Sequence, residues 1–418
     1  MEKIKIDSLS FGEGYGVGRS EGKVVFVPYG VPGDVVTVEI TEEKKRYSIG
    51  KIIDIEEKSP LRIEAACRYF GECGGCQWLN IGYGDELEWK EKLVRETLER
   101  LGGVECGEIE VFRSPKELGY RARATFHRHE GKLGYHKRSS NEIVEIDSCP
   151  LLCEELNATL EELRAMKIPR EVTTIEVAHL GGSVGVVFNA KELKGGFKPE
   201  PTGSISGVKV ITKNRAGRKK VLWKSGEQEL KQDVFGVTVI TSLGSFMQGN
   251  TELNEVLVGY VTEEAGEDKE ALAIDLFSGS GNFALTLAKK FKKVTAVESD
   301  SASVVVGRKG LALAGLENVK FITGNAYKDE FYDKCKDLEK DAPAVVILDP
   351  PRGGADAALE KAAGLAPEKI IYVSCNPSTL ARDLRRLPEL GLKIDKIALF
   401  DMFPRTFHVE TVVSISRA

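Results

Sequence analysis

The sequence predicts an α/β protein whose C-terminal part is a doubly wound domain, preceded by a small β-barrel and a mixed α+β segment. Residues 1–57 alternate short β-type runs with glycine turns, which is typical of small barrels. Residues 106–240 mix β-type runs with one helical pattern near 152–166. From about residue 271, apolar strands alternate with helical patterns, which indicates a mostly parallel sheet covered by helices.

Composition places the chain among globular proteins of two or three domains. Its 418 residues are 42% hydrophobic and 29% charged, which provides a sizeable core and excludes a disordered or fibrous chain. No apolar run approaches the roughly 18–20 residues that span a bilayer, and the N-terminus lacks the apolar segment of a signal peptide. The net charge of −5 leaves room for local basic patches. We expect a cytoplasmic monomer without a membrane partner.

Linkers and changes of pattern divide the chain into three domains. The barrel is expected over 1–58, where a lysine-rich tail and Ser59-Pro60 mark its end. The central domain is expected over 59–240. A strongly charged helical pattern over 85–105 is a candidate to pack on the third domain, although it comes early in the chain. The third domain is expected over 241–418.

The regular alternation of apolar runs and helical patterns in the third domain predicts its strands and helices. Helices are expected over 282–290 and 300–315. The expected strands are Ala271–Phe277, Val294–Val297, Ala344–Leu348, Ile370–Val373, Lys396–Phe400 and Val409–Ile415.

A glycine loop follows the first of these strands. In Asp275–Phe283 the glycines let the backbone turn tightly and approach a ligand at the carboxyl edge of the sheet. Glu298 ends the next strand, where an acidic side chain can accept hydrogen bonds from two ribose hydroxyls. The glycine loop and Glu298 together indicate a cofactor that contains adenosine. NAD would prefer a third glycine, where this chain has Ala284, and the Asp-x-Phe-x-Gly-x-Gly form instead resembles the S-adenosylmethionine (SAM) loop of class I methyltransferases.

Two further motifs end later strands of the same sheet. Asp349-Pro350-Pro351-Arg352 follows one apolar strand, and Ser374-Cys375-Asn376-Pro377 follows the next. Because the carboxyl ends of parallel strands meet at one edge, we expect the carboxylate and the thiol beside the cofactor. An isolated cysteine is usually a small buried hydrophobe. A cysteine that leaves an apolar strand at a ligand-binding edge is instead a candidate nucleophile.

A thiol and a carboxylate suit methyl transfer to C5 of a uracil ring. That carbon is too weakly nucleophilic to attack a methyl sulfonium directly, so a thiolate first adds at C6 and raises the electron density at C5. A base then removes the C5 proton so that the thiol can leave. Glu410, just before the last apolar strand, is the candidate base, although a lone charge in such a place is more often an ion-pair partner.

Five ordered motifs resemble the RNA 5-methyluridine (uracil-5) methyltransferase family of the TrmA/RumA type, over essentially the whole chain. The motifs are Phe246-Met247-Gln248-Gly249-Asn250, the Asp275–Phe283 loop, Asp349-Pro350-Pro351-Arg352, Ser374-Cys375-Asn376-Pro377, and Asp401 to Glu410. The resemblance implies a Rossmann-like class I SAM methyltransferase domain with Cys375 as nucleophile and Glu410 as base. It also implies that the SAM and target-base sites are lined by Gln248, Phe277, Asn282, Glu298, Asn325 and Asp349.

A separate group of cysteines suggests a metal centre. Cys67, Cys73 and Cys76 form a Cys-x5-Cys-x2-Cys triplet, and Cys149 follows far along the chain before a proline. Four thiolates can hold zinc or an iron–sulfur cluster, and this spacing is closer to ferredoxin-type ligation than to paired zinc-ribbon motifs. The resembled family has a branch with a [4Fe-4S] cluster on this spacing, which implies these four residues as ligands and leaves Cys153 as a nearby extra thiol.

Local basic charge points to RNA. Between Arg113 and Arg138 eight Lys or Arg stand against two Glu, with aromatic residues interleaved, and Lys209–Lys231 again carries eight against two. Such segments suit phosphate contacts and base stacking, although most basic runs are solvated surface. The barrel resembles a TRAM domain, an RNA-binding module, with candidate contacts at Phe11, Tyr15 and Tyr29.

These inferences predict methylation of C5 of a uridine in structured RNA, with the target base flipped out of its stack. The branch that the chain resembles includes 23S ribosomal RNA enzymes, which favours that substrate. The nearest alternative is the T-loop uridine of tRNA. A more distant alternative is an RNA-binding cluster sensor with an inert catalytic domain.

Overall fold

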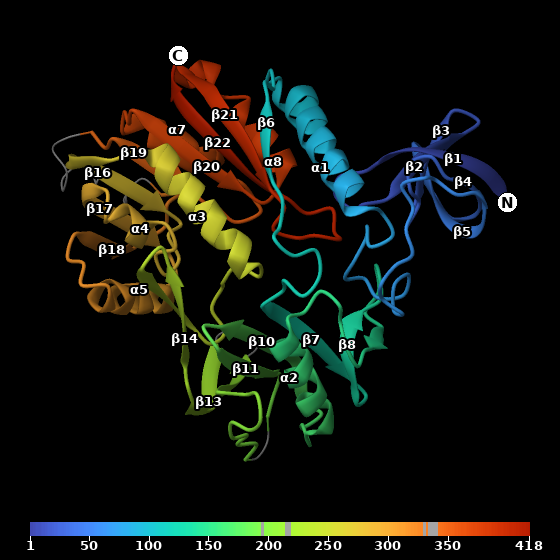
Figure 1. The fold of residues 1–418 in the computed structure, drawn as a ribbon, viewed down its shortest axis with the longest axis horizontal. Coiled ribbons are helices and arrows are strands. Elements are labelled where there is room, and N and C mark those ends of the chain that lie inside the picture. Colours follow the sequence, from blue (N-terminus) through green and yellow to red (C-terminus); the bar gives the residue numbers. More distant parts are fainter. Residues whose placement is uncertain (194–195, 214–218, 329–331, 333–341) are drawn as a thin grey trace.

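The N-terminal residues form a closed barrel, as the sequence predicts (Figure 1). The computed structural model describes residues 1–418 except 194–195, 214–218, 329–331 and 333–341. Ile4 and Ile6 alternate with exposed residues and fill the barrel core, as expected of a half-buried strand. The strands pair in the order β1-β2-β3-β5-β4 and are β1 (Glu2–Leu9), β2 (Gly16–Ser20), β3 (Lys23–Val27), β4 (Val35–Glu43) and β5 (Tyr47–Glu57).

A seven-stranded sheet follows in the order β13-β12-β11-β10-β7-β8-β9. Its strands are β7 (Arg123–His129), β8 (Lys132–His136), β9 (Ile143–Glu145), β10 (Val172–Leu180), β11 (Ser183–Ala190), β12 (Gly207–Lys213) and β13 (Lys219–Gly226). Helix α2 (Glu154–Ala165) packs Leu156, Leu160 and Leu163 into the core of this sheet. A hairpin of β14 (Glu229–Val234) and β15 (Val237–Ser242) leads to the last part of the chain.

The C-terminal part is an eight-stranded sheet in the order β18-β17-β16-β19-β20-β22-β21-β6. Its strands are β6 (Ile109–Phe112), β16 (Asp268–Leu276), β17 (Phe291–Glu298), β18 (Val319–Thr323), β19 (Val345–Leu348), β20 (Lys369–Ser374), β21 (Leu392–Phe400) and β22 (Glu410–Arg417). The strands from β18 to β20 run parallel, and β22 is antiparallel to both its neighbours.

Apolar cores cover both faces of this sheet, which makes it doubly wound. Along β19, Val345 and Ile347 belong to one core, and Val346 and Leu348 belong to the other. The helices are α3 (Thr251–Ala265), α4 (Ala284–Leu287), α5 (Ser301–Leu313), α7 (Asp356–Gly364) and α8 (Pro377–Leu384). Of the two expected helices, α5 matches its range, and α4 is a shorter piece of the one expected over 282–290. No helix among the described residues has the length and apolar character needed to cross a bilayer.

An early segment of the chain completes this sheet. Helix α1 (Tyr83–Thr97) continues into a π-helical turn (Leu98–Gly102), and β6 then pairs in parallel with β21 at the sheet edge. Val94 and Leu98 are fully buried in the core that also contains Leu380 and Leu384 of α8. In Figure 1, α1 lies beside β6 and α8, between the sheet and the barrel.

A buried ion network joins α1 to the loop before β22. The Lys90 ammonium donates to Glu86 Oε1 at 2.7 Å, to Asp401 Oδ1 at 2.6 Å and to the Phe403 carbonyl at 3.2 Å. Burial opposes this charge, but the carboxylates of Asp401 and Glu86 outweigh it and raise the pKa of Lys90. Glu86 Oε1 also accepts from the Arg405 backbone N–H at 2.7 Å, so one helix holds both the start and the middle of the loop.

We predict that Lys90→Met destabilises the protein by about 3–5 kcal/mol, because it leaves the buried Asp401 carboxylate without its cation and Glu86 with the more distant Arg405 guanidinium, at 3.6 Å. Urea denaturation followed by circular dichroism measures the free energy of unfolding. The matched control is Lys92→Ala, an exposed residue on the same helix, for which we expect a change within about 0.5 kcal/mol. Equal effects of the two substitutions would show that the network does not stabilise the fold.

Candidate active site

The sheet register brings the predicted catalytic residues to one edge. Ser374 at the end of β20 pairs with Thr411 of the antiparallel strand β22. One residue further along this register, Cys375 lies beside Glu410. Asp349 follows β19, whose last residue pairs with Tyr372 of β20. A thiol and two carboxylates therefore converge where the parallel strands end.

Cys375 sits in a fixed turn between β20 and α8. The Asn376 side chain caps α8 by accepting from the Ser378 backbone N–H at 3.1 Å, and Pro377 occupies the first turn. The Asn376 amide also donates to the Arg352 carbonyl at 3.2 Å. These contacts tie the cysteine turn to the Asp-Pro-Pro-Arg motif.

Electrostatics keep the thiol neutral in the resting protein. Burial, together with the smaller effect of the Glu410 and Asp349 carboxylates, raises the pKa of Cys375 to about 12, and the Arg352 guanidinium opposes this rise. Glu410 is 4% exposed, and burial together with Asp349 raises its pKa well above the usual value. Burial also raises the pKa of Asp349 to about 7. Arg352 is therefore the group that favours thiolate formation at this edge.

The glycine loop forms one wall of a cavity at the same edge. Gln248, Phe277, Asn282 and Asp349 line this cavity together. Phe277 has a φ of 69°, an uncommon value for a residue with a side chain. The buried Asp275 carboxylate accepts from the Ala284 backbone N–H at 2.9 Å, which fixes the loop at the start of α4.

The other two predicted cofactor residues lie outside this lining. Glu298 ends β17 next to the loop, where its Oε2 accepts from the Gly279 backbone N–H at 3.0 Å. Asn325 follows β18, and its side chain accepts from the Tyr327 backbone N–H at 2.9 Å. Asn254 of α3 also lines the cavity, where its amide exchanges hydrogen bonds with that of Asn282 at 3.0 and 3.1 Å. Sequence reasoning missed Asn254, which has no motif around it.

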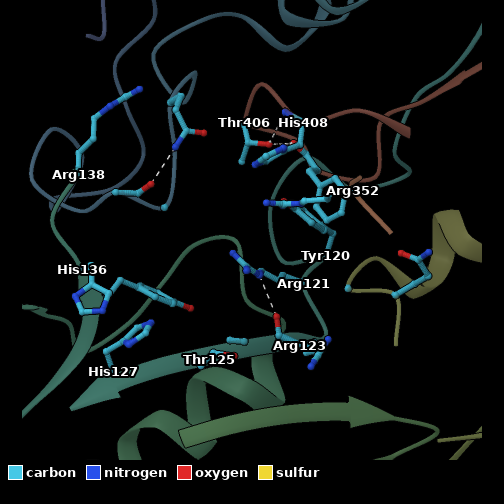
Figure 2. A pocket seen from close by; sticks show the side chains of 18 of the residues that line it. Tyr120, Arg121, Arg123, Thr125, His127, His136, Arg138, Arg352, Thr406 and His408 are labelled. Carbon is cyan, nitrogen blue, oxygen red and sulfur yellow. Dashed lines mark hydrogen bonds between the residues drawn. The ribbon is translucent and has the colours of Figure 1, made fainter. Parts of the chain in front are cut away.

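A cleft of about 640 Å³ opens next to the reactive edge, between all three parts of the chain (Figure 2). Figure 2 shows Arg352 and His408 from the C-terminal part on one side, and His127 and His136 from the central sheet on the other. Its basic lining residues are Arg121, Arg123, Lys137, Arg138 and Arg352. Phe246, Met247 and Gln248 line both this cleft and the cofactor cavity, so the two spaces are adjacent.

The two basic segments have different positions. Arg121, Arg123, Lys137 and Arg138 of the first segment line the cleft. The second segment forms β12, β13 and β14, and no described residue of it lines the cleft; Arg215 and Arg218 lie outside the described residues. The first segment is therefore the better candidate for an RNA contact at the active site.

Arg138 joins the barrel to the central sheet. Its guanidinium lies 4.2 Å from the ring centre of Tyr15 and 5.5 Å from that of Tyr29, and it donates to the Glu13 carbonyl. Tyr15 is 9% exposed, so the expectation that this side chain offers a surface for RNA is wrong. Burial also raises the pKa of Tyr29, against the opposing Arg138 cation. Both tyrosines serve the joint between domains.

The four cysteines of the predicted metal centre line one small cavity. Cys67, Cys73, Cys76 and Cys149 share it with apolar residues and with Arg121, and Cys153 is not among the described residues that line it. Within the described part of the chain, no three of the four sulfurs approach one another within 4.8 Å. The sulfurs of a tetrahedral zinc site lie about 3.8 Å apart, given Zn–S bonds of about 2.3 Å. The thiols are therefore spread more widely than a single zinc ion would hold them.

Comparison with known proteins decides the family. The model of tRNA (uracil-5-)-methyltransferases matches residues 203–418, and the TRAM domain model matches residues 2–53. The chain belongs to this methyltransferase family. With the cofactor cavity and the reactive edge, this makes it a SAM-dependent RNA methyltransferase that forms 5-methyluridine.

Similar proteins cover this RNA methyltransferase from end to end. An RNA methyltransferase of Caldanaerobacter subterraneus is 32% identical, covering 98% of this chain and 97% of its own. A 23S rRNA (uracil(1939)-C(5))-methyltransferase of Photorhabdus laumondii is 31% identical, covering 99% and 96%. The crystal structure of a Pyrococcus abyssi tRNA (uracil-54, C5)-methyltransferase with S-adenosyl-L-homocysteine is 25% identical, with a TM-score of 0.79, covering 99% and 100%.

We predict that Arg352→Gln slows alkylation of Cys375 by iodoacetamide at pH 8 by at least about threefold. Removing a neighbouring cation raises the pKa of the thiol and so lowers the thiolate fraction. Mass spectrometry of the modified peptide over a range of pH measures the rate. The control is Arg386→Gln, an arginine that pairs with Asp356 and Glu360 away from the cleft. An unchanged or faster reaction would remove Arg352 from this role.

Proposed function

We propose that this enzyme methylates C5 of one uridine in 23S ribosomal RNA, with Cys375 as the nucleophile and Glu410 as the base. The observation that carries the proposal is the juxtaposition of Cys375 and Glu410 at a sheet edge that lies between a cofactor cavity and a basic cleft. One side of this edge can hold the methyl donor and the other can hold RNA.

The donor site suits an adenosine-containing molecule. Gln248, Phe277, Asn282 and Asp349 offer aromatic, amide and carboxylate groups to one cavity, and Glu298 lies beside its glycine loop. These residues, with Asn325, would hold SAM, which supplies an electrophilic methyl group when bound. Glu298 would release the Gly279 N–H and accept from the ribose hydroxyls.

The chain's own residues would carry the covalent steps. The Cys375 thiolate adds to C6 of the uracil, and the electron pair of the C5–C6 bond becomes available at C5. After C5 is methylated, the Glu410 carboxylate takes the C5 proton, the double bond re-forms and the thiolate leaves. Asp349, which lines the cofactor cavity at the same edge, would contact the flipped base. Arg352 stabilises the sulfur anion at the start and at the end.

Each of the three predicted domains would have its own role. Residues 241–418 would carry the chemistry, 59–240 would hold the cysteine centre and one wall of the cleft, and 1–58 would bind RNA outside the cleft. A uridine stacked in folded RNA cannot reach Cys375, so the cleft would receive a flipped base. Arg121, Arg123 and Lys137 would hold the flanking phosphates. The enzyme would act as a monomer.

The Photorhabdus relative, a 23S rRNA methyltransferase, supports a ribosomal substrate, because the match to it covers 99% of the present chain. The Pyrococcus structure, which is of a tRNA (uracil-54, C5)-methyltransferase, supports the alternative, the T-loop uridine of tRNA. We propose a cytoplasmic location, where either RNA would meet the enzyme.

The cysteine cavity supports a [4Fe-4S] cluster on Cys67, Cys73, Cys76 and Cys149. The four thiols face one space and are spaced more widely than zinc requires. Burial, with a smaller contribution from the neighbouring thiols, raises the pKa of Cys73 to about 11. A metal centre would remove that penalty by holding the sulfurs as thiolates.

Transfer of labelled methyl groups from SAM tests the proposal on unmodified 23S rRNA and unmodified tRNA side by side. We expect 5-methyluridine in the ribosomal RNA alone, and we expect Cys375→Ala to abolish it because no thiolate can add to C6. Cys106→Ser, at a half-buried cysteine away from the edge, is the control. Label in tRNA alone would establish the alternative, and label in neither RNA would refute both.

We predict that Glu410→Gln accumulates a covalent protein–RNA adduct, because addition and methylation proceed while removal of the C5 proton stalls. Denaturing gel electrophoresis with labelled RNA would show a band of retarded mobility that disappears in the Cys375→Ala, Glu410→Gln double variant. Glu389→Gln, on an exposed turn, is the control. Full turnover by Glu410→Gln would exclude Glu410 as the base.

A further inference from the structure

A second group of metal-binding side chains lies outside the four-cysteine cavity. Cys153 precedes α2, Glu155 lies in its first turn, and His179 lies near the end of β10. One ligand atom from each residue lies within 4.8 Å of the other two. A thiol, an imidazole and a carboxylate form a typical donor set for zinc.

The distances are close to those of a tetrahedral zinc site. Cys153 Sγ lies 3.8 Å from His179 Nδ1, and His179 Nδ1 lies 3.6 Å from Glu155 Oε2. In a tetrahedron with Zn–S of about 2.3 Å and Zn–N and Zn–O of about 2.0–2.2 Å, those edges are about 3.6 and 3.4 Å. Small side-chain rotations would close the remaining 0.2 Å on each edge, and Glu155 is 48% exposed and free to make them.

The surroundings allow a cation. Lys116 is the nearby positive charge that acts on Glu155 and Cys153, but its side chain is 55% exposed and its ammonium pairs with Glu252. His179 is 19% exposed, so its ring is partly shielded while the site stays open to solvent on the side of Glu155. An open side leaves room for a water as the fourth ligand.

We propose that Cys153, Glu155 and His179 bind a zinc-class divalent cation, separately from the cysteines that line the four-thiol cavity. The site would join the start of α2 to β10 across the segment that bears Arg121. The backbone N–H groups of Cys153 and His179 already donate to the carbonyls of Arg121 and Ala122, at 3.1 and 2.8 Å. A bound ion would therefore hold the floor of the cleft in place.

The test uses full-length, cluster-loaded protein prepared without oxygen, given one equivalent of Zn²⁺ and dialysed against micromolar free zinc. X-ray absorption at the zinc edge reports zinc alone, and elemental analysis reports iron and zinc together. We expect one retained zinc per chain with one sulfur neighbour at about 2.3 Å and nitrogen or oxygen neighbours at about 2.0–2.1 Å.

Variants separate this site from the cluster. Cys153→Ser should remove the sulfur neighbour, and His179→Gln and Glu155→Gln should each weaken zinc binding at least tenfold, with iron content unchanged in all three. Cys106→Ser should change neither metal. Cys76→Ser should lose iron and keep the zinc with its single sulfur.

Three results would overturn the proposal. Zinc surrounded by four sulfurs would show that it had entered the cluster cysteines. Loss of all zinc on dialysis would show that the three side chains do not form a site. Loss of iron in Cys153→Ser, with iron retained in Cys149→Ser, would assign Cys153 to the cluster instead.

Discussion

The buried ammonium of Lys90 is the constraint on which the active site depends. It binds Glu86 on its own helix and Asp401 at the far end of the chain, and the same Glu86 holds the backbone of Arg405. The loop between Asp401 and Val409 leads directly into Glu410, so the position of the proposed base is set by a helix that comes more than 300 residues earlier. Buried charges are costly to desolvate. Removing the Lys90 cation would leave Asp401 without its ion pair and Glu86 with the Arg405 guanidinium, at 3.6 Å, as its remaining described partner. The network thus commits α1 and the final strands to one arrangement.

The same low-polarity surroundings define the chemistry at the sheet edge. Burial raises the pKa of Cys375, Glu410 and Asp349, and their negative charges oppose one another. The resting site therefore favours a neutral thiol and opposes ionisation of both carboxyl groups at once. Arg352 is the cation that opposes this tendency for both Cys375 and Glu410. When the sulfur adds to the uracil ring, the ring takes up the negative charge of the thiolate. The bound substrate therefore favours reaction of Cys375 as the thiolate.

The motifs at strand ends were predictable from sequence because their physics is local. An apolar strand followed by Asp-Pro-Pro-Arg or Ser-Cys-Asn-Pro places those side chains at the carboxyl edge in any parallel sheet, and the register of β20 and β22 follows this rule. Lys90 was not predictable, because Glu86 and Lys90 at i and i+4 read as an ordinary exposed pair. Arg138 shows the same limit. Its segment is visibly basic, but only the folded chain shows that this guanidinium, which lines the cleft like Arg121 and Arg123, also packs on the tyrosines of the barrel.

Arg121 connects the cleft with the four-cysteine cavity. Its side chain lines both the cleft and the four-cysteine cavity. Burial raises the pKa of Cys73, Cys76 and Cys149, and the Arg121 cation opposes that rise, so it favours the thiolate forms that metal ligation requires. A cluster that holds those sulfurs as anions would in turn stabilise the half-buried Arg121 guanidinium beside the RNA cleft. Such a centre would matter to methylation without any electron transfer, because it would keep one cation fixed in the floor of the cleft.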